Sequence, residues 1–156
     1  MQSCALGVLA LQSPVQMGVY VHGVLRYSLV SSCKTSEALG VLFARVRAWM
    51  ACHGYRLGAI YYAVGPGSFM AMKLVHVFVH TVASAQNLKL YGALGFAFNA
   101  YQPIKAFGNS YYCYHQGTIY LSPLSNPTTQ NMRLPILLKS HIFGVDPKPL
   151  YLLPPI

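Results

Sequence analysis

The stretch that decides the fold runs from Ala59 to Tyr91 and reads AIYYAVGPGSFMAMKLVHVFVHTVASAQNLKLY. It opens with a short apolar strand over 59–64, which ends in the turn Gly65-Pro66-Gly67-Ser68. An apolar helix from Phe69 to Ala85 follows, and a return strand covers Leu88 to Tyr91. A strand, a helix and a second strand in this order predict an α/β sheet with helices packed on it.

The residues before this stretch predict three more strands and a helix. The strands are Ala5 to Leu11, Val15 to Val21 and Val24 to Val30, and the last two form a hairpin. Ser36 is expected to cap a helix that Gly54 ends. A third helix is expected from Gly92 to Tyr101. The order βββαβα, followed by one more strand and helix, predicts a mixed sheet.

The residue pattern changes after Pro103, where helical periodicity gives way to short strands and prolines. A hairpin is expected over 110–121 around Gln116-Gly117, and prolines then interrupt the chain up to Pro154-Pro155. We therefore expect one lobe over residues 1–101. A shortened second lobe with an extended, proline-rich tail is expected over residues 102–156.

Composition narrows the class of protein. The 156 residues suffice for about one domain, and 54% are hydrophobic while 8% are charged. These values exclude a disordered tail, a coiled coil and an acidic solvating segment, because each needs many charges. A surface so poor in charge predicts that another chain covers part of it.

The charge balance is strongly positive, with a formal net charge of +9. A positive field favours anionic partners such as RNA, although the basic residues are scattered along the chain. Glu37 and Asp146 are the only acids, which argues against a hydrolase that uses paired carboxylates.

Cysteine spacing and hydropathy indicate a soluble cytoplasmic protein. The cysteines form no C-x-x-C pair, so reduced and buried thiols are expected at Cys4, Cys33, Cys52 and Cys113. No basic residue precedes Arg26, so the charged start of a signal peptide is missing. The charge-free stretches over 57–72 and 74–88 contain Gly, Pro or His and are too short for a membrane span.

The glycine-proline turn has two interpretations of its own. Gly65 and Gly67 allow a positive φ or a close backbone approach, and Ser68 can cap the helix. The N–H groups exposed there would suit an anion. A plain strand-to-helix connection explains the same residues.

In its wider context the turn resembles that of the bacterial TsaB family, formerly called YeaZ. The similarity rests on A-V-G-P-G-S-F over 63–69, with Lys73 in the place of a family arginine and Gly92 closing the return strand. Fainter similarities cover Lys34 to Leu39, Gly7 to Pro14 and Ala106 to Tyr112.

This resemblance implies an actin-like ATPase (ASKHA, ribonuclease H-like) fold and a function. TsaB is a non-catalytic subunit of the machinery that makes N6-threonylcarbamoyladenosine in tRNA. Its implied partners are the catalytic subunit TsaD, the ATPase subunit TsaE, a second copy of itself, and tRNA through the complex. No cofactor of its own is implied, with ATP or its products at the interface with the partners. Gln12 stands where the family commonly has an Asp, which argues against nucleotide chemistry by this chain alone.

The catalytic TsaD family has two metal-binding histidines after the return strand, where this chain has no His over 92–98. His76 and His80 lie one helical turn apart and could form a metal pair, but no third ligand is evident. We therefore expect neither a catalytic residue nor a metal site.

The helix from Phe69 has hardly any polar face, so it should be buried on both sides. The sheet can cover one side, and the resemblance implies that a partner covers the other, since TsaB pairs through its first two helices. The expected core and interface residues on the two helices are Leu39, Leu42, Phe43, Val46, Lys73, His76, Phe78 and Val82.

Two other functions are consistent with the sequence. The first is a glycoprotease-like enzyme, with Ser68 as nucleophile and His76 or His80 as base. The second is a basic tRNA-binding module, whose affinity for tRNA would fall steeply with salt.

Overall fold

The computed structural model describes residues 1–150, which form a six-stranded sheet, a three-stranded sheet and two long helices. The elements, in chain order, are β1 (Gln2–Leu9), β2 (Val15–Val21), β3 (Val24–Ser31), α1 (Thr35–Cys52), β4 (Tyr55–Gly65), α2 (Phe69–Gln86), β5 (Lys89–Leu94), the short 3-10 helix η1 (Gly95–Phe98), β6 (Ile104–Phe107), β7 (Ser110–His115), β8 (Thr118–Pro123), the 3-10 helix η2 (Ser140–Ile142) and β9 (Gly144–Val145).

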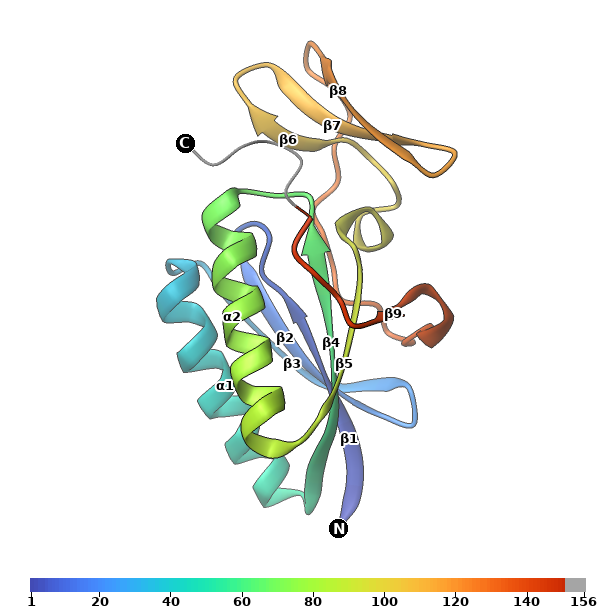
Figure 1. The fold of residues 1–156 in the computed structure, drawn as a ribbon. Helices are drawn as coiled ribbons and strands as arrows, with labels where there is room; N and C mark the ends of the chain where they lie inside the picture. The colour runs from blue at the N-terminus through green and yellow to red at the C-terminus, as the bar shows by residue number, and fades with distance from the viewer. Residues whose placement is uncertain (151–156) are drawn as a thin grey trace.

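The larger sheet is mixed, as the sequence predicts. Its strand order is β3-β2-β1-β4-β5-β9, and β4 pairs in parallel with both β1 and β5. The remaining pairs are antiparallel. Both helices lie side by side on one face of this sheet, while β6, β7 and β8 form a separate sheet beyond the ends of the helices (Figure 1).

The main core lies between the helices and the larger sheet. Alternate residues of the central strands, such as Leu6 and Ile60, point toward the helices and are fully buried. Val46 of α1 and Val75 and Val79 of α2 meet them from the other side. One apolar stripe of each helix is thereby removed from water, which is the main force holding the layers together.

A stack of aromatic rings joins α1 to two strands of the sheet. Trp49 lies nearly parallel to Tyr27 of β3 and to Tyr55 of β4, with centroid distances of 4.9 and 5.6 Å. His53 stacks on the same indole at 4.3 Å. The last turn of α1 is therefore fixed against both the edge strand and the middle of the sheet.

The opposite face of the sheet is covered by residues 131–143, here called the strap. The side-chain amide of Gln16 holds it at two points: its Nε2 donates to the Met132 carbonyl (2.8 Å), and its Oε1 accepts from the Leu134 N–H (3.3 Å). The Tyr20 hydroxyl donates to the Pro135 carbonyl at 2.6 Å. Buried backbone groups need hydrogen-bond partners, and here side chains of β2 supply them for the strap's carbonyl and N–H groups.

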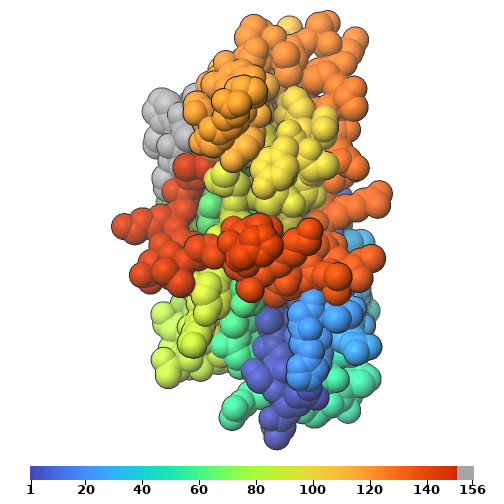
Figure 2. Space-filling view, turned by 90° about the vertical axis from the view of Figure 1, so that its right-hand side faces the viewer, coloured from blue at the N-terminus to red at the C-terminus, as the bar shows by residue number. Residues whose placement is uncertain are grey.

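The strap and the residues after it also reach both edges of the larger sheet. The N–H of Leu25 in β3 donates to the Ile136 carbonyl (2.8 Å), and at the other edge β9 pairs with β5. Figure 2 looks onto this side and shows the orange-red segment lying across the sheet. The division of the chain at residue 101 stays a prediction, and the chain beyond it contributes to both sheets.

Two expectations about helices are wrong. The third helix expected over 92–101 is absent, because 92–94 continue β5 beside β4 and only η1 follows. Positive φ angles at Ala100 and Tyr101 then end any helical path. The first helix begins at Thr35 with Lys34 in the capping position, so Ser36 is already inside it.

Other expectations are confirmed. The hairpin around Gln116-Gly117 forms between β7 and β8, and the helix expected from Phe69 to Ala85 is α2, which ends one residue later with Asn87 in the left-handed conformation. Cys4 and Cys113 are buried free thiols, but Cys33 and Cys52 are exposed. No helix within residues 1–150 combines the length and apolarity needed to cross a membrane. The expected extended tail with Pro154-Pro155 lies outside the described residues.

Candidate functional site

The glycine-proline turn joins the end of β4 to the start of α2. Ser68 is the N-cap, as predicted, and its Oγ accepts a hydrogen bond from the Ala71 N–H at 3.1 Å. Phe69 is the first helical residue, and Pro66 is buried within the turn. Because Ser68 Oγ is engaged in capping, it is poorly placed to act as a nucleophile.

Close packing explains both glycines of the turn. Gly65 has a φ of +143°, and a Cβ there would lie 2.7 Å from the Met72 sulfur. A Cβ on Gly67 would lie 3.2 Å from Leu11, in the loop that follows β1. The turn thus packs directly against the residue before Gln12, the position where the sequence departs from the TsaB pattern.

The structure separates the predicted interface residues into two groups. Leu39, Leu42 and Val46 of α1 and Val82 of α2 belong to the core against the sheet. Phe43 and Phe78 lie half-buried between the helices, with their rings edge to face at 5.4 Å. Within the folded chain, the core members are not available to a partner, so their predicted role reduces to packing.

The exposed side of α2 carries apolar residues that the sequence did not single out as a site. Met70 and Val77, two helical turns apart, are 58% and 55% exposed, and Lys73 lies exposed between them. We call the surface formed by Phe43, Met70, Lys73, Val77 and Phe78 the helix face. The signal was present in the sequence as a helix without a polar side, but the buried and exposed stripes could not be told apart.

His76 and His80 follow Lys73 by one and two helical turns, on the flank of α2 that borders β4 and β5. The Tyr62 hydroxyl and His76 Nδ1 share a hydrogen bond of 3.1 Å, and the two imidazole rings are 4.1 Å apart. Burial, and secondarily the nearby His80, lower the pKa of His76. Among residues 1–150, no cluster of three His, Cys, Asp or Glu side chains is placed to hold a metal ion.

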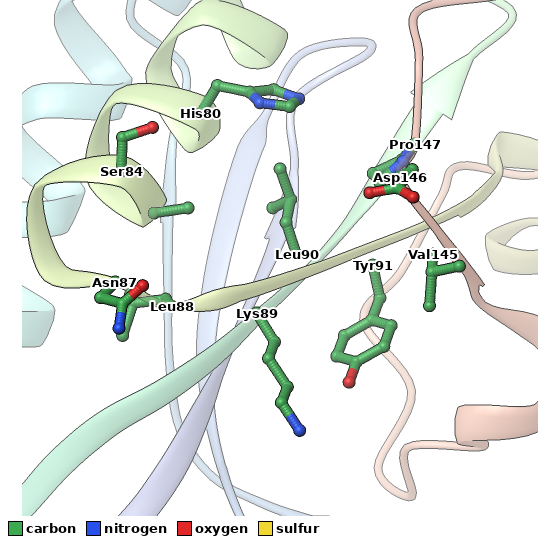
Figure 3. A pocket seen from close by; sticks show the side chains of 11 residues that line it. His80, Ser84, Asn87, Leu88, Lys89, Leu90, Tyr91, Val145, Asp146 and Pro147 are labelled. Carbon is green, nitrogen blue, oxygen red and sulfur yellow. The ribbon is translucent and has the colours of Figure 1, made fainter.

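His80 borders a pocket of about 620 Å³ between α2, β5 and the loop after β9. Figure 3 shows His80 and Ser84 projecting from α2, with Asp146 on the loop across the pocket and Lys89 on β5. The Nε2 atom of His80 is buried and has no hydrogen-bond partner within the described chain. The sequence did not indicate that Asp146 would share a pocket with this histidine, because the two are far apart along the chain.

Comparisons with known proteins identify the fold. No protein-family model and no curated protein matches the chain. Among solved structures it is similar to YeaZ from Pseudomonas aeruginosa, with 17% identity and a TM-score of 0.59 over 83% of this chain and 68% of that one. A second structure is described as an uncharacterized protein with similarity to peptidase YEAZ from Pseudomonas aeruginosa. It has 16% identity and a TM-score of 0.56 over 78% of this chain and 64% of its own.

The structure contains the elements expected from the turn motif, namely a mixed sheet, helices packed on it and a glycine-proline turn between β4 and α2. The fold as a whole is similar to that of YeaZ. The resemblance proposed from the sequence is thereby confirmed at the level of architecture. The chain has the mixed α/β fold of YeaZ.

Proposed function

We propose that this protein is a TsaB-type subunit of the complex that makes N6-threonylcarbamoyladenosine in tRNA. In this role it is a non-catalytic scaffold with an actin-like ATPase fold, which binds the catalytic subunit TsaD through the helix face. The observation that carries the proposal is the apolar, solvent-exposed side of α2 in a chain with the fold of YeaZ.

The energetics of the helix face favour a protein partner. Met70 and Val77 expose more than half of their side chains while the aromatic pair beneath them is half-buried. Removing such apolar surface from water stabilises a complex by roughly 25 cal/mol per Å² before the costs of association. Lys73 within this face would add a charged contact at the rim of the interface.

The chemistry of the complex would reside in the partners. Gln12 offers a neutral amide where the TsaB pattern commonly has a carboxylate, and an amide supports a metal-bound phosphate weakly. ATP or its products, TsaE and the tRNA would therefore meet at the interface with the partners. The scaffold would act by favouring a competent state of TsaD.

The proposal is tested by co-expression with a TsaD-family subunit. Val77→Asp places a charge in the centre of the helix face, and Val30→Asp is the matched control, since Val30 is 64% exposed on β3. An unpaired charge in an apolar interface costs about 2 kcal/mol or more, which weakens binding more than tenfold. Affinity is measured by calorimetry on purified proteins.

A 1:1 complex that Val77→Asp disrupts and Val30→Asp leaves intact supports the scaffold function. Failure of the unmodified chain to bind the subunit, or equal loss in both variants, would refute it. Val82→Asp is unsuitable for this purpose, because Val82 lies in the core and its substitution would unfold the chain.

A peptidase is the second candidate, favoured by one specific observation. Ser84, His80 and Asp146 all line the pocket of Figure 3, and one structural neighbour is described by similarity to a peptidase. No hydrogen bond joins any two of these side chains within the described residues, whereas an activated serine needs its base at about 3 Å. A fluorophosphonate labels activated serines. Labelling of the unmodified chain that is lost in Ser84→Ala would support the peptidase function.

A further inference from the structure

The small sheet of β6, β7 and β8 has one face directed into the molecule and one directed outward. Ile104 and Tyr112 belong to the second core cluster, and Tyr114 and Ile119 pack against it. Side chains alternate along a strand, so the intervening residues lie on the other face. This outer face carries Lys105, Tyr111, Cys113, His115, Tyr120 and Ser122.

Two tyrosines lie next to each other on the outer face. Cys113 pairs directly with Tyr120 across the strands, and Tyr111 pairs with Ser122, so Tyr111 and Tyr120 are diagonal neighbours. Tyr120 is 48% exposed, and the small side chain of Cys113 lies buried beside it. Tyr111 is half-buried. Two phenol rings at such diagonal positions can each stack on one base, and we call this pair the platform.

The one charged residue on the small sheet is a lysine. Lys105 of β6 is exposed and pairs directly with Tyr111 across the strands. No acidic residue occurs anywhere between Glu37 and Asp146, so nothing on the small sheet offsets this lysine. The platform would attract a polyanion and repel cationic ligands.

We propose that the outer face of the small sheet binds single-stranded nucleic acid. Two unstacked bases would lie on Tyr111 and Tyr120, and Lys105 would contact the backbone phosphate between them. Exposed aromatic rings beside basic groups on an antiparallel sheet suit unpaired bases, because every base has a face that can stack. A duplex keeps its bases stacked on each other and could use only the lysine.

This inference does not rest on the proposed function. The small sheet lies beyond the ends of α1 and α2 and shares no residue with the helix face (Figure 1). Either proposal can therefore fail without the other.

The test is fluorescence anisotropy of the full chain with labelled twelve-nucleotide oligo(U), oligo(dT) and a duplex of the same length. We expect both single strands to bind more tightly than the duplex, and a preference between them would show whether ribose is recognised. Tyr120→Ala and Tyr111→Ala should each raise the Kd by about fivefold or more. Tyr120→Phe keeps the stacking ring and should bind like the unmodified chain.

The lysine is tested through salt. Lys105→Gln should weaken binding and lower the slope of log K against log salt by about 0.7, as expected for one lost phosphate contact. Lys34→Gln is the matched control, since Lys34 is exposed at the start of α1. Equal losses in the two lysine variants, unchanged affinity in both alanine variants, or a duplex bound as tightly as the single strands would each overturn the proposal.

Discussion

At the scale of single residues, His76 has a different contact from the one that the sequence predicts. The sequence predicts a partner contact for it, together with Phe78 on the same helix. The structure places its ring against Tyr62 in β4, one helical turn after Lys73 of the helix face. The side chain thus links the helix to the sheet. We therefore expect its protonation state to affect the stability of the fold.

The lowered pKa of His76 has a consequence for stability. In the unfolded chain His76 has its ordinary pKa of 6.5, whereas in the folded chain its pKa is lower, so the folded chain is protonated at His76 at a lower pH. The unfolded state therefore gains protons first, and stability should fall as the pH drops below about 6.5. Urea unfolding at pH 7.5 and 5.5 measures this loss.

We expect His76→Gln to reduce this pH dependence, because the titrating group is gone. His141→Gln is the control, since His141 is exposed in η2 and the pH dependence should persist there. Identical pH profiles for the two variants would show that His76 is not the group responsible.

The turn residues show what local sequence can predict about a site. Gly65, Gly67 and Ser68 were predicted from residue type alone, because a tight strand-to-helix turn needs a positive φ or a close approach and a cap. Val77 could not be assigned in the same way. On a helix with no polar side, the sequence does not indicate which apolar residues pack on the sheet and which stay exposed. The structure is needed to assign Val77 to the exposed stripe.

At the scale of elements, most of the strands and both long helices follow from local patterns. The strap does not, because its contacts join residues more than a hundred positions apart, such as Gln16 and Met132. Gly7 and Gly18 face each other across β1 and β2 and leave the space that Leu134 fills. Glycine inside a strand often signals such an approach, but it does not identify the segment that approaches.

This packing predicts opposite effects for two glycine-to-alanine substitutions. A Cβ on Gly7 would lie 2.8 Å from the ring of Tyr20, which holds the strap, so Gly7→Ala should lower the free energy of unfolding by about 1–3 kcal/mol. Gly40 in α1 has no heavy atom within 4 Å of a new Cβ. Gly40→Ala should therefore stabilise the chain by about 0.5–1 kcal/mol.

Urea denaturation measures both changes, and limited proteolysis within 131–143 reports whether the strap has loosened. Equal stability of Gly7→Ala and the unmodified chain would show that Tyr20 and Leu134 can move aside without cost.

At the scale of the whole molecule, the fold presents two separate surfaces. The helix face is apolar and lies on the outer side of α2, whereas the outer face of the small sheet is aromatic and basic. The strap lies on the opposite side of the larger sheet from the helices, so it covers neither α1 nor α2 (Figures 1 and 2).

This separation predicts that the two binding events are independent. Val77→Asp should leave the affinity for oligo(U) within about twofold, because the two surfaces share no residues and substitutions at independent sites are additive. Tyr120→Ala should likewise leave binding of the TsaD-family subunit unchanged. Calorimetry and anisotropy on both variants measure this, and loss of both activities in either variant would indicate one shared surface or a misfolded chain.

The aromatic stack at the end of α1 makes the protein its own optical probe. Trp49 is the sole tryptophan among 156 residues, and Tyr27 and Tyr55 flank it from strands on either side of β1 and β2. Excitation of the indole alone therefore yields a signal from one known place, where the first helix docks. A label-free emission spectrum can follow assembly of this layer while other regions change unseen.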